Sequence, residues 1–272
     1  MRTSTSRNLV DAMPVRLISH LPEAGGRRHP LLFVHGAWHG AWSWEEHFMP
    51  WFATQGFECH AFDLRHHGEA GGPGTLRRSR ISHYVYDLAD AVSQVDRPPI
   101  LVAHSMGGLV AQRYLERREL PGAVLMASVP IGGVWRATGR TIRRHPLKFL
   151  QANLRLDLAP LVDTRRMARS MLYDPDIDDA TVERLHPRLQ GESYLAYVDM
   201  LFVTRPRPPL VRSPVAVVIG TEDRIFSVKE ARRLAGAYGV KARVVEGAGH
   251  DLMMGPRWQR TASLVLEAIE AL

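Results

Sequence analysis

The sequence has very little cysteine: Cys59 is the only one among 272 residues. A single cysteine cannot form an intramolecular disulfide, so the fold depends on its core, and the composition fits a reducing compartment. Cys59 lies in an apolar run at 57–62, which predicts a buried thiol rather than a reactive one. The sequence also lacks an uninterrupted apolar stretch of ~18–20 residues, the length needed to cross a membrane.

A secretion signal is missing as well. The first 12 residues carry Arg2 and Arg7 but no apolar segment of the kind that a signal contains. We therefore expect a cytoplasmic protein. Lys and Arg number 35 against 28 Asp and Glu, a net charge of +7, which favours anionic surroundings or simply keeps the protein in solution. No zinc-finger, recognition-helix or RNA-binding aromatic motif accompanies this charge, so no nucleic acid partner is expected.

Short apolar runs with little alternation recur along the chain, which is typical of strands covered on both faces of a parallel sheet. Helical patterns separate these runs, and residues 14–20 suit an additional edge strand. The alternation predicts an α/β fold: a mostly parallel central sheet flanked by helices. The predicted strands are 31–34, 57–62, 100–103, 123–127, 215–219 and 242–245, and the predicted helices are 42–55, 83–95, 106–117, 228–238 and 258–272.

The alternation stops between residues 131 and 213, where the pattern is helical or irregular and rich in proline. Most connections between strands and helices are far shorter. We therefore predict a helical cap at 131–213, inserted into an α/β core formed by residues 1–130 and 214–272. Loops at the carboxyl ends of parallel strands face the ligand crevice, so the cap is expected to cover the functional site.

A serine motif, AHSMGG at 103–108, lies between a predicted strand and a predicted helix. Serine in such a tight turn presents its hydroxyl at the edge of the sheet, and small neighbours are needed because the turn leaves no room for larger side chains. The start of the helix also offers backbone N–H groups to a developing oxyanion. Ser105 is therefore the predicted nucleophile.

A serine hydroxyl needs a base to activate it, and the base needs a carboxylate to orient it. Glu222 and Asp223 follow the predicted strand at 215–219, and His250 follows the one at 242–245. An acid and then a histidine after successive strands reproduce the order Ser, Asp, His. This order predicts His250 as the base and Asp223 as the acid, with Glu222 as the alternative acid.

The motif HGAWHG, which begins at His35, follows the first strand of the predicted core. Gly36 permits a sharp turn, so that the N–H of Ala37 can join the N–H of Met106 in an oxyanion hole. The two histidines of the motif are four residues apart, as metal ligands on a helix are. Here they lie in a glycine-rich loop without a third ligand nearby, and we predict no metal site.

Together these motifs resemble the α/β-hydrolase superfamily. The segment HGAWHGAW is similar to that of its cofactor-independent esterases and lipases, including the plant methylesterase and hydroxynitrile lyase branch, and the similarity covers residues 31–133 and 214–272. The sequence has Ala103 and His66 where glycine is more common, and neither change removes a catalytic atom. The resemblance implies that no cofactor is needed and assigns the nucleophile, acid, base and oxyanion donors to Ser105, Asp223, His250, Ala37 and Met106.

The resemblance also argues against some reactions. Haloalkane dehalogenases and epoxide hydrolases have aspartate at the position of Ser105, and hydroxynitrile lyases have threonine and lysine at the positions of Gly36 and Asp251. We therefore expect a serine hydrolase that cleaves carboxylic esters through an acyl-enzyme. The same triad also serves for thioester, amide or C–C bond cleavage and for perhydrolysis. A non-catalytic, ligand-binding member of the fold is the alternative of another class.

The predicted cap holds 14 Lys and Arg against 9 Asp and Glu. Its segment 135–148 mixes basic with apolar residues and contains no acid, which predicts a weak contact with an anionic membrane surface; a solvated helix face is the alternative. The segment 194–202 is strongly apolar. We expect its Tyr194 and Tyr197, together with Trp38, to line a pocket over Ser105 that takes a small-molecule ester or a lipid-like substrate.

Overall fold

The computed structural model describes residues 14–23, 26 and 29–272. The first 12 residues, in which the sequence predicts no secretion signal, lie outside the described residues. In the described part, seven strands form one sheet in the order β1-β3-β2-β4-β5-β6-β7. Only the edge strand β1 runs antiparallel to its neighbour; the other pairs are parallel. The strands are β1 (Leu17–His20), β2 (Leu31–Val34), β3 (Cys59–Phe62), β4 (Ile100–His104), β5 (Gly122–Met126), β6 (Val215–Gly220) and β7 (Ala242–Val245).

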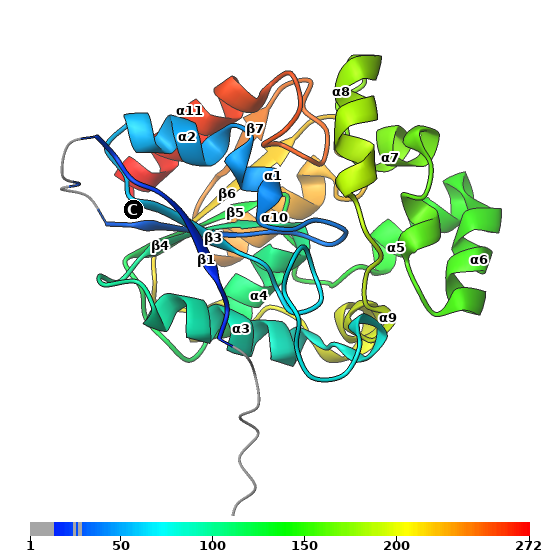
Figure 1. Ribbon diagram of the computed structural model, residues 1–272, viewed down its shortest axis with the longest axis horizontal. Helices are drawn as coiled ribbons and strands as arrows, with labels where there is room; N and C mark the ends of the chain where they lie inside the picture. Colours follow the sequence, from blue (N-terminus) through cyan, green and yellow to red (C-terminus); the bar gives the residue numbers. More distant parts are fainter. Residues whose placement is uncertain (1–13, 24–25, 27–28) are drawn as a thin grey trace, which may run out of the picture.

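Helices cover both faces of this sheet, which confirms the predicted fold class (Figure 1). α1 (Trp42–Glu45), α2 (Phe48–Thr54) and α11 (Trp258–Glu270) lie on one face. α3 (Ile81–Ser93), α4 (Ser105–Leu115) and α10 (Val228–Ala237) lie on the other. The five interior strands are buried along their whole length because helices cover them on both sides.

The prediction of one continuous helix at 42–55 is wrong, because the structure has two helices there, α1 and α2. Pro50 explains the interruption. Proline has no N–H to donate to the carbonyl of residue 46, and its ring collides with the preceding turn of a helix. The chain therefore starts a new helix at Phe48, which places Pro50 in the first turn, where no N–H is required.

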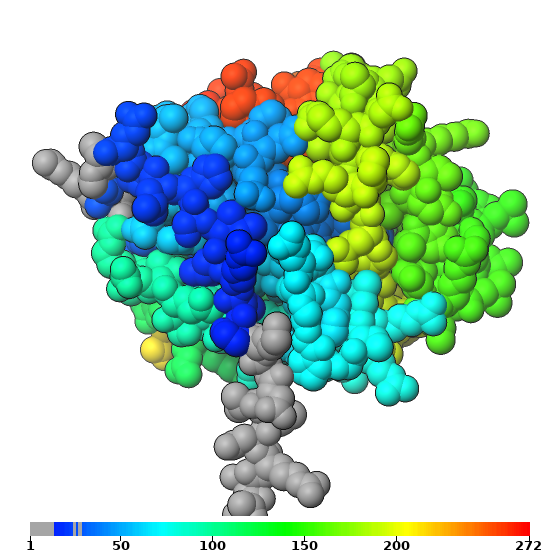
Figure 2. Space-filling model, in the orientation of Figure 1, coloured from blue at the N-terminus to red at the C-terminus, as the bar shows by residue number. Residues whose placement is uncertain are grey.

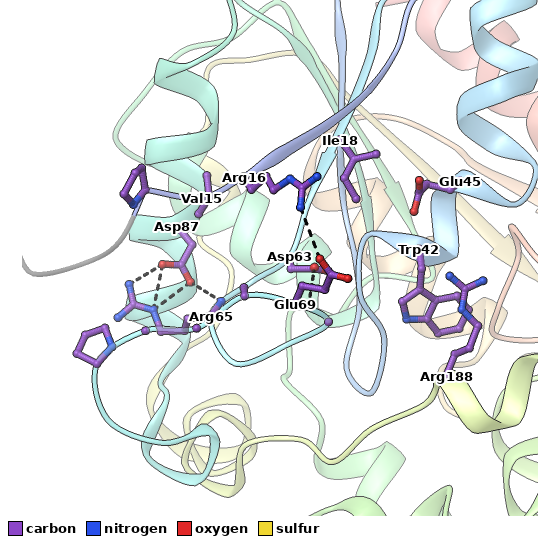
Figure 3. Close-up of a pocket in the computed structure, with 16 residues that line it drawn as sticks. Val15, Arg16, Ile18, Trp42, Glu45, Asp63, Arg65, Glu69, Asp87 and Arg188 are labelled. Carbon is purple, nitrogen blue, oxygen red and sulfur yellow. Dashed lines mark hydrogen bonds and ion pairs between the residues drawn. The ribbon is translucent and has the colours of Figure 1, made fainter.

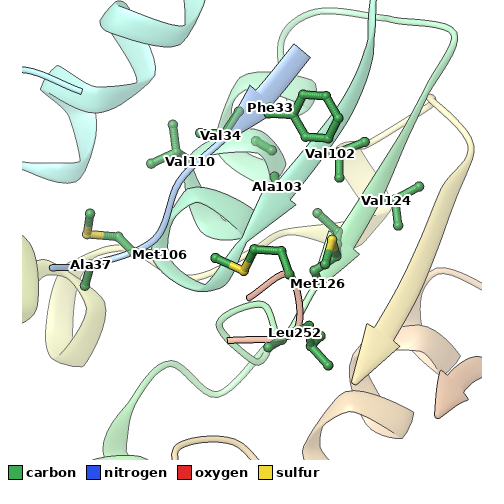
Figure 4. Close-up of a cluster of buried hydrophobic side chains, with 14 of the residues drawn as sticks. Phe33, Val34, Ala37, Val102, Ala103, Met106, Val110, Val124, Met126 and Leu252 are labelled. Atoms are coloured by element: carbon green, nitrogen blue, oxygen red, sulfur yellow. The ribbon is translucent and has the colours of Figure 1, made fainter. Parts of the chain in front are cut away.

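The core extends beneath the turn between β4 and α4 (Figure 4). Phe33 and Val102 lie side by side on paired strands, with Phe33 against Trp44 of α1, and Val110 of α4 lies on the opposite face of the sheet; all of them are buried. Leu252 joins the same cluster from the segment after β7. This packing anchors the start of α4 and the segment after β7 to one rigid core, so residues at these two places have fixed relative positions.

Residues 131–213, which we refer to as the cap, connect β5 to β6 and lie to one side of the sheet (Figures 1 and 2). All of them are described, and they form no strand. Short 3₁₀ turns join the helices, and Pro146 begins α6 at the first helical position, where proline is favoured. The helices are α5 (Trp135–Arg144), α6 (Pro146–Arg155), α7 (Arg165–Met171), α8 (Asp179–Leu185), α9 (Tyr194–Val198) and a π-helical turn (Asp199–Val203).

Polar contacts join the cap to the core. Arg80, at the start of α3, makes a two-pronged contact with Asp199. His67, in the loop after β3, donates from Nε2 to Oε2 of Glu192 at 3.0 Å. The Tyr84 hydroxyl donates to Oε1 of Glu192 at 3.1 Å. Since the His67 and Glu192 side chains are both fully buried, this connection is shielded from solvent.

Candidate active site

Ser105 lies at the sharp turn where β4 ends and α4 begins. Its φ angle is +51°, in the left-handed region that residues with side chains rarely adopt. The neighbourhood leaves room only for glycine at two nearby positions. A Cβ atom at Gly107 would lie 2.3 Å from the carbonyl oxygen of His35, and one at Gly36 would lie 2.9 Å from the Cβ of Ser105. The geometry therefore accounts for the small residues of the serine motif.

The structure brings Ser105, Asp223 and His250 together. The Ser105 hydroxyl lies 2.9 Å from Nε2 of His250, and Nδ1 of His250 lies 2.9 Å from Oδ2 of Asp223. The other oxygen of Asp223 accepts the backbone N–H groups of Ile225 and Phe226, each at 2.8 Å. These bonds orient the carboxylate of Asp223, rather than that of Glu222, towards the histidine. The three residues follow β4, β6 and β7, whose carboxyl ends meet at one edge of the sheet.

The electrostatic surroundings suit a histidine that gains a proton. Burial lowers the pKa of His250, but the Asp223 carboxylate raises it more, and the net shift is upwards. His104 lies beside it, with the two ring centroids 4.8 Å apart. Burial, together with the nearby His250, lowers the pKa of His104 to about 3. His104 is therefore neutral and does not repel the charge that would develop on His250.

An apolar cavity of about 70 Å³ opens at the Ser105 hydroxyl. Ala37 and Met106, the predicted oxyanion donors, line it on either side of the serine, and Trp38 and Tyr197 also face it. Tyr194, which was expected to join them, does not line the cavity. Its ring lies against that of Tyr197, and its hydroxyl donates to Oδ1 of Asn153 at 2.7 Å.

Sequence reasoning missed most of the other residues around this cavity. Ala137, Thr138 and Thr141 come from the inner face of α5, and the spacing of small residues at 137 and 141 is the only local sign of that face. The remaining residues reach the cavity from separate segments and have no common pattern in the sequence. They are Val129, Val134, Phe149, Leu158, Leu161, Met171, Met200, Ile225 and Phe226.

A larger cavity, of about 730 Å³, is lined mainly by β1, α1 and the loop after β3 (Figure 3). Its charged side chains are largely paired with one another: Arg65 with Asp87, and Arg16 with Glu69. The Arg188 guanidinium lies over the ring of Trp42, 4.4 Å from the centroid. None of the three residues of the Ser105 cluster reaches this cavity, so the smaller, apolar cavity is the candidate active site.

Across the residues that the structure describes, no three His, Cys, Asp or Glu side chains are grouped so that they could hold a metal ion. The same residues contain no helix that combines the length and the apolar character needed to span a bilayer.

Comparisons with known proteins agree with this fold. Residues 31–264 match the model of a family described as the alpha/beta hydrolase family. A non-heme chloroperoxidase from Streptomyces lividans is 34% identical over 106 residues, which is 37% of this chain and only 37% of that relative's length. The structure of a monoacylglycerol lipase from Paleococcus ferrophilus superimposes with a TM-score of 0.70 at 19% identity, over 96% of this chain and 100% of that one. An esterase from Thermogutta terrifontis gives 0.67 at 20% identity, over 94% and 93%.

Proposed function

Because this chain belongs to the alpha/beta hydrolase family, we propose that it is a serine hydrolase that cleaves carboxylic esters through an acyl-enzyme. The observation that carries this proposal is the continuous hydrogen-bond chain from Ser105 through His250 to Asp223, with both links at 2.9 Å. Ser105, at the end of this series of hydrogen bonds, lines an apolar cavity in which a substrate carbonyl can approach its hydroxyl. A ligand-binding protein without catalysis would not require this arrangement of nucleophile, base and acid.

In the proposed mechanism, Ser105 attacks the ester carbonyl while His250 accepts the hydroxyl proton through Nε2. Asp223 holds the imidazole in the correct orientation and stabilises its positive charge. The backbone N–H groups of Ala37 and Met106 stabilise the oxyanion of the tetrahedral intermediate. The protonated His250 then donates its proton to the leaving alcohol. In the second half, His250 removes a proton from water, which attacks the acyl-enzyme and releases the acid.

The cavity favours an apolar acyl group, since its lining contains few polar atoms besides Ser105 and the threonine hydroxyls of α5. Small-molecule or lipid esters are the matching substrates, and the lipase and esterase folds among the structural neighbours are consistent with them. The chloroperoxidase match favours one alternative, perhydrolysis, in which hydrogen peroxide replaces water in the attack on the acyl-enzyme. The same nucleophile, base and oxyanion donors would serve both reactions.

The test is the initial rate of hydrolysis of p-nitrophenyl esters from acetate to palmitate, with Ser105→Ala as the control. Ser105-dependent turnover supports the ester hydrolase, and the preferred chain length measures the depth of the cavity. Adding hydrogen peroxide and a carboxylic acid, with peracid as the product measured, tests perhydrolysis. A folded protein that turns over none of these esters, although a fluorophosphonate labels Ser105, would contradict the proposed substrate class.

We also propose that the cap contacts an anionic membrane surface through α5 and α6. Residues 135–156 contain six Lys and Arg and no Asp or Glu. Leu147, Leu150 and Leu154 are 80%, 55% and 78% exposed, and their spacing places them on one face of α6. α6 lies at the outer edge of the cap (Figure 1). Apolar anchors combined with basic residues are the two signals that binding to an anionic bilayer requires.

The same two helices face the active site on their other side, since Thr141 of α5 and Phe149 of α6 line the cavity. A membrane bound to the outer face would therefore lie one helix layer away from the site of an apolar substrate. A second copy of the chain is a poorer partner for this face. Arg140 and Lys148 are paired with Glu230 and Asp163, but two such surfaces would still bring the net positive charge of their remaining arginines together.

Vesicle flotation tests this contact, with Ser105→Ala protein and phosphatidylcholine vesicles that contain or lack phosphatidylglycerol. We expect binding to the anionic vesicles alone, weakened by salt and lost in Leu147→Gln/Leu154→Gln. The matched control is Leu21→Gln/Leu210→Gln, which changes exposed leucines outside α5 and α6. Equal binding to both vesicles, equal loss in the control, or a wild-type dimer that α6 substitution dissociates would each contradict the proposal.

A further inference from the structure

Two residues outside the proposed triad, His39 and Asp251, form a fully buried pair beside the active site. Nε2 of His39 donates to Oδ2 of Asp251 at 3.0 Å, and neither side chain has any exposed surface. The other ring nitrogen, Nδ1, donates to the carbonyl oxygen of Ala37 at 2.7 Å. His39 belongs to the loop after β2, and Asp251 immediately follows His250. The pair therefore connects this loop, which carries the proposed oxyanion donor Ala37 and which we call the oxyanion loop, to the segment that carries the proposed catalytic base.

The hydrogen-bond partners determine the protonation state of His39. A backbone carbonyl oxygen and a carboxylate oxygen can only accept, so both ring nitrogens of His39 must donate. His39 is therefore an imidazolium with Asp251 as its counterion. Burial alone would raise the pKa of the Asp251 carboxyl, but the neighbouring histidines, His39 first among them, hold it below its usual value.

His35, on the same loop, provides the contrast. Its Nδ1 donates to the carbonyl of Gly36 at 2.8 Å, while its Nε2 accepts the backbone N–H of Leu64 at 3.0 Å. One nitrogen donates and the other accepts, so His35 is neutral. Burial, aided by nearby His67, lowers its pKa well below the usual value. The charge on His39 is therefore specific to its position and is not a general property of histidines in this loop.

The bond from His39 to Ala37 spans Trp38, whose φ angle is +66°. A left-handed conformation at a bulky residue is strained and persists only where its surroundings hold it. His39 provides one such restraint from within the loop. At the other end of the pair, the Asp251 N–H donates to the carbonyl of Leu172 at 2.9 Å, which fixes the backbone next to His250.

We propose that the His39–Asp251 ion pair is a positioning element that holds the oxyanion loop in register with the catalytic histidine. This proposal rests on the proposed function, because the oxyanion donor that it positions is the N–H of Ala37. The charge has a specific purpose here. A neutral histidine has only one N–H and could not donate to Ala37 and to a carboxylate together, so one end of the connection would be lost.

The charge state can be measured without any assay of activity. Long-range ¹H–¹⁵N correlation NMR of the full-length protein should show both ring nitrogens of His39 protonated, because both face acceptors. His35 should show one. In Asp251→Asn, the amide can donate to Nε2, so His39 should become neutral while Nδ1 still donates to Ala37. A His39 that is neutral in the wild type would overturn the assignment of the ion pair.

Kinetics test the positioning role. His39→Leu/Asp251→Leu removes both charges together, so that no unpaired ion is left buried. We expect kcat to fall about 10²-fold with KM changed less than about threefold, the pattern of a misplaced oxyanion donor. Asp251→Asn keeps the hydrogen bond to Ala37 and should retain most of kcat. The affinity of a trifluoromethyl ketone, which forms an oxyanion on Ser105, should fall in the double variant by the same factor as kcat.

The matched control is His67→Leu/Glu192→Leu, which removes the other fully buried histidine–carboxylate pair described above. The His67 ring packs against His35, with centroids 5.1 Å apart, but the pair makes no hydrogen bond to Ala37 or His39, so its removal should change the free energy of unfolding and leave kcat unaltered. Equal loss of kcat in both double variants, or wild-type kcat in His39→Leu/Asp251→Leu, would overturn the proposal. Absence of Ser105-dependent turnover in the wild type would instead reject the proposed function. The NMR and ketone measurements would then still test the charge of His39 and the positioning role of the His39–Asp251 pair.

Discussion

The substitution Glu192→Leu should remove the buried connection between the cap and the loop after β3. In the wild type, Oε2 of Glu192 accepts from Nε2 of His67 at 3.0 Å, and Oε1 accepts from the Tyr84 hydroxyl at 3.1 Å. Oε1 also accepts the backbone N–H of Ser193 at 2.6 Å. Leucine accepts none of these bonds. The substitution therefore leaves a histidine and a phenol buried without their partners.

The expected cost is about 3–5 kcal/mol in the free energy of unfolding, the range for removing one partner of a buried ion pair. His67 is charged in the wild type because Nδ1 also faces an acceptor, the Arg65 carbonyl at 3.1 Å. Glu192→Gln is the informative control. Its amide can donate to Nε2 of a neutral His67 and accept from Tyr84, so that every bond survives without the charge. We expect this variant to lose only about 1 kcal/mol.

The pH dependence provides a second check. Burial lowers the pKa of His67, but Glu192 raises it more, and the net shift is above the ordinary value of 6.5. A raised pKa in the folded state means that the ion pair contributes its full stability below pH 6.5. This contribution is lost as the pH rises through the folded pKa. The difference in free energy of unfolding between the wild type and Glu192→Gln should therefore shrink as the pH rises.

Urea unfolding followed by both circular dichroism and tryptophan fluorescence measures these energies, and coincident transitions justify two-state treatment. The curves should be recorded from about pH 6, below the ordinary pKa of histidine, upwards to about pH 9. If the free energy of unfolding of Glu192→Leu lies within about 1 kcal/mol of that of the wild type, the His67–Glu192 pair is not the strong restraint inferred from its burial. A wild-type advantage over Glu192→Gln that grows with pH would refute the charge assigned to His67.

Five further predictions concern the proposed active site. Ser105→Ala should abolish ester turnover without lowering Tm, and residual turnover at the wild-type rate would reject the nucleophile. Asp223→Asn should lower kcat about 10⁴-fold, because the histidine loses its orienting carboxylate. The base must be neutral to accept a proton, and the pKa of His250 is raised. We therefore expect kcat/KM to fall on acidification with a midpoint above pH 6.5. A midpoint below pH 6.5 would contradict the raised pKa. Ala137→Leu should fill part of the cavity and move the preferred acyl chain to shorter esters. Gly107→Ala should prevent folding, because its Cβ would lie 2.3 Å from a backbone carbonyl oxygen. Solubility and circular dichroism measure this loss of folding.

Local patterns in the sequence were sufficient to predict the sheet and to select the candidate catalytic residues that the structure brings together. Apolar runs of four to six residues predict strands buried on both faces, and the structure has strands at each of the predicted places. The order of Ser105, Asp223 and His250 also follows from local signals. Each lies just after a strand, and parallel strands bring these positions to one edge of the sheet. Neighbouring residues impose these constraints, so they can be recognised without knowing the tertiary structure.

Other features depend on contacts between distant segments. His39 and Asp251 are 212 residues apart, and His67 and Glu192 are 125 apart, and in the sequence each resembles an ordinary polar residue. Tyr194 and Tyr197 look equivalent in the sequence, yet only Tyr197 reaches the cavity. The short-range pattern determines which residues can be buried or catalytic. Packing between distant segments of the core and the cap decides which of them share a low-dielectric pocket, and therefore which histidines we expect to carry a charge and which side chains line the cavity.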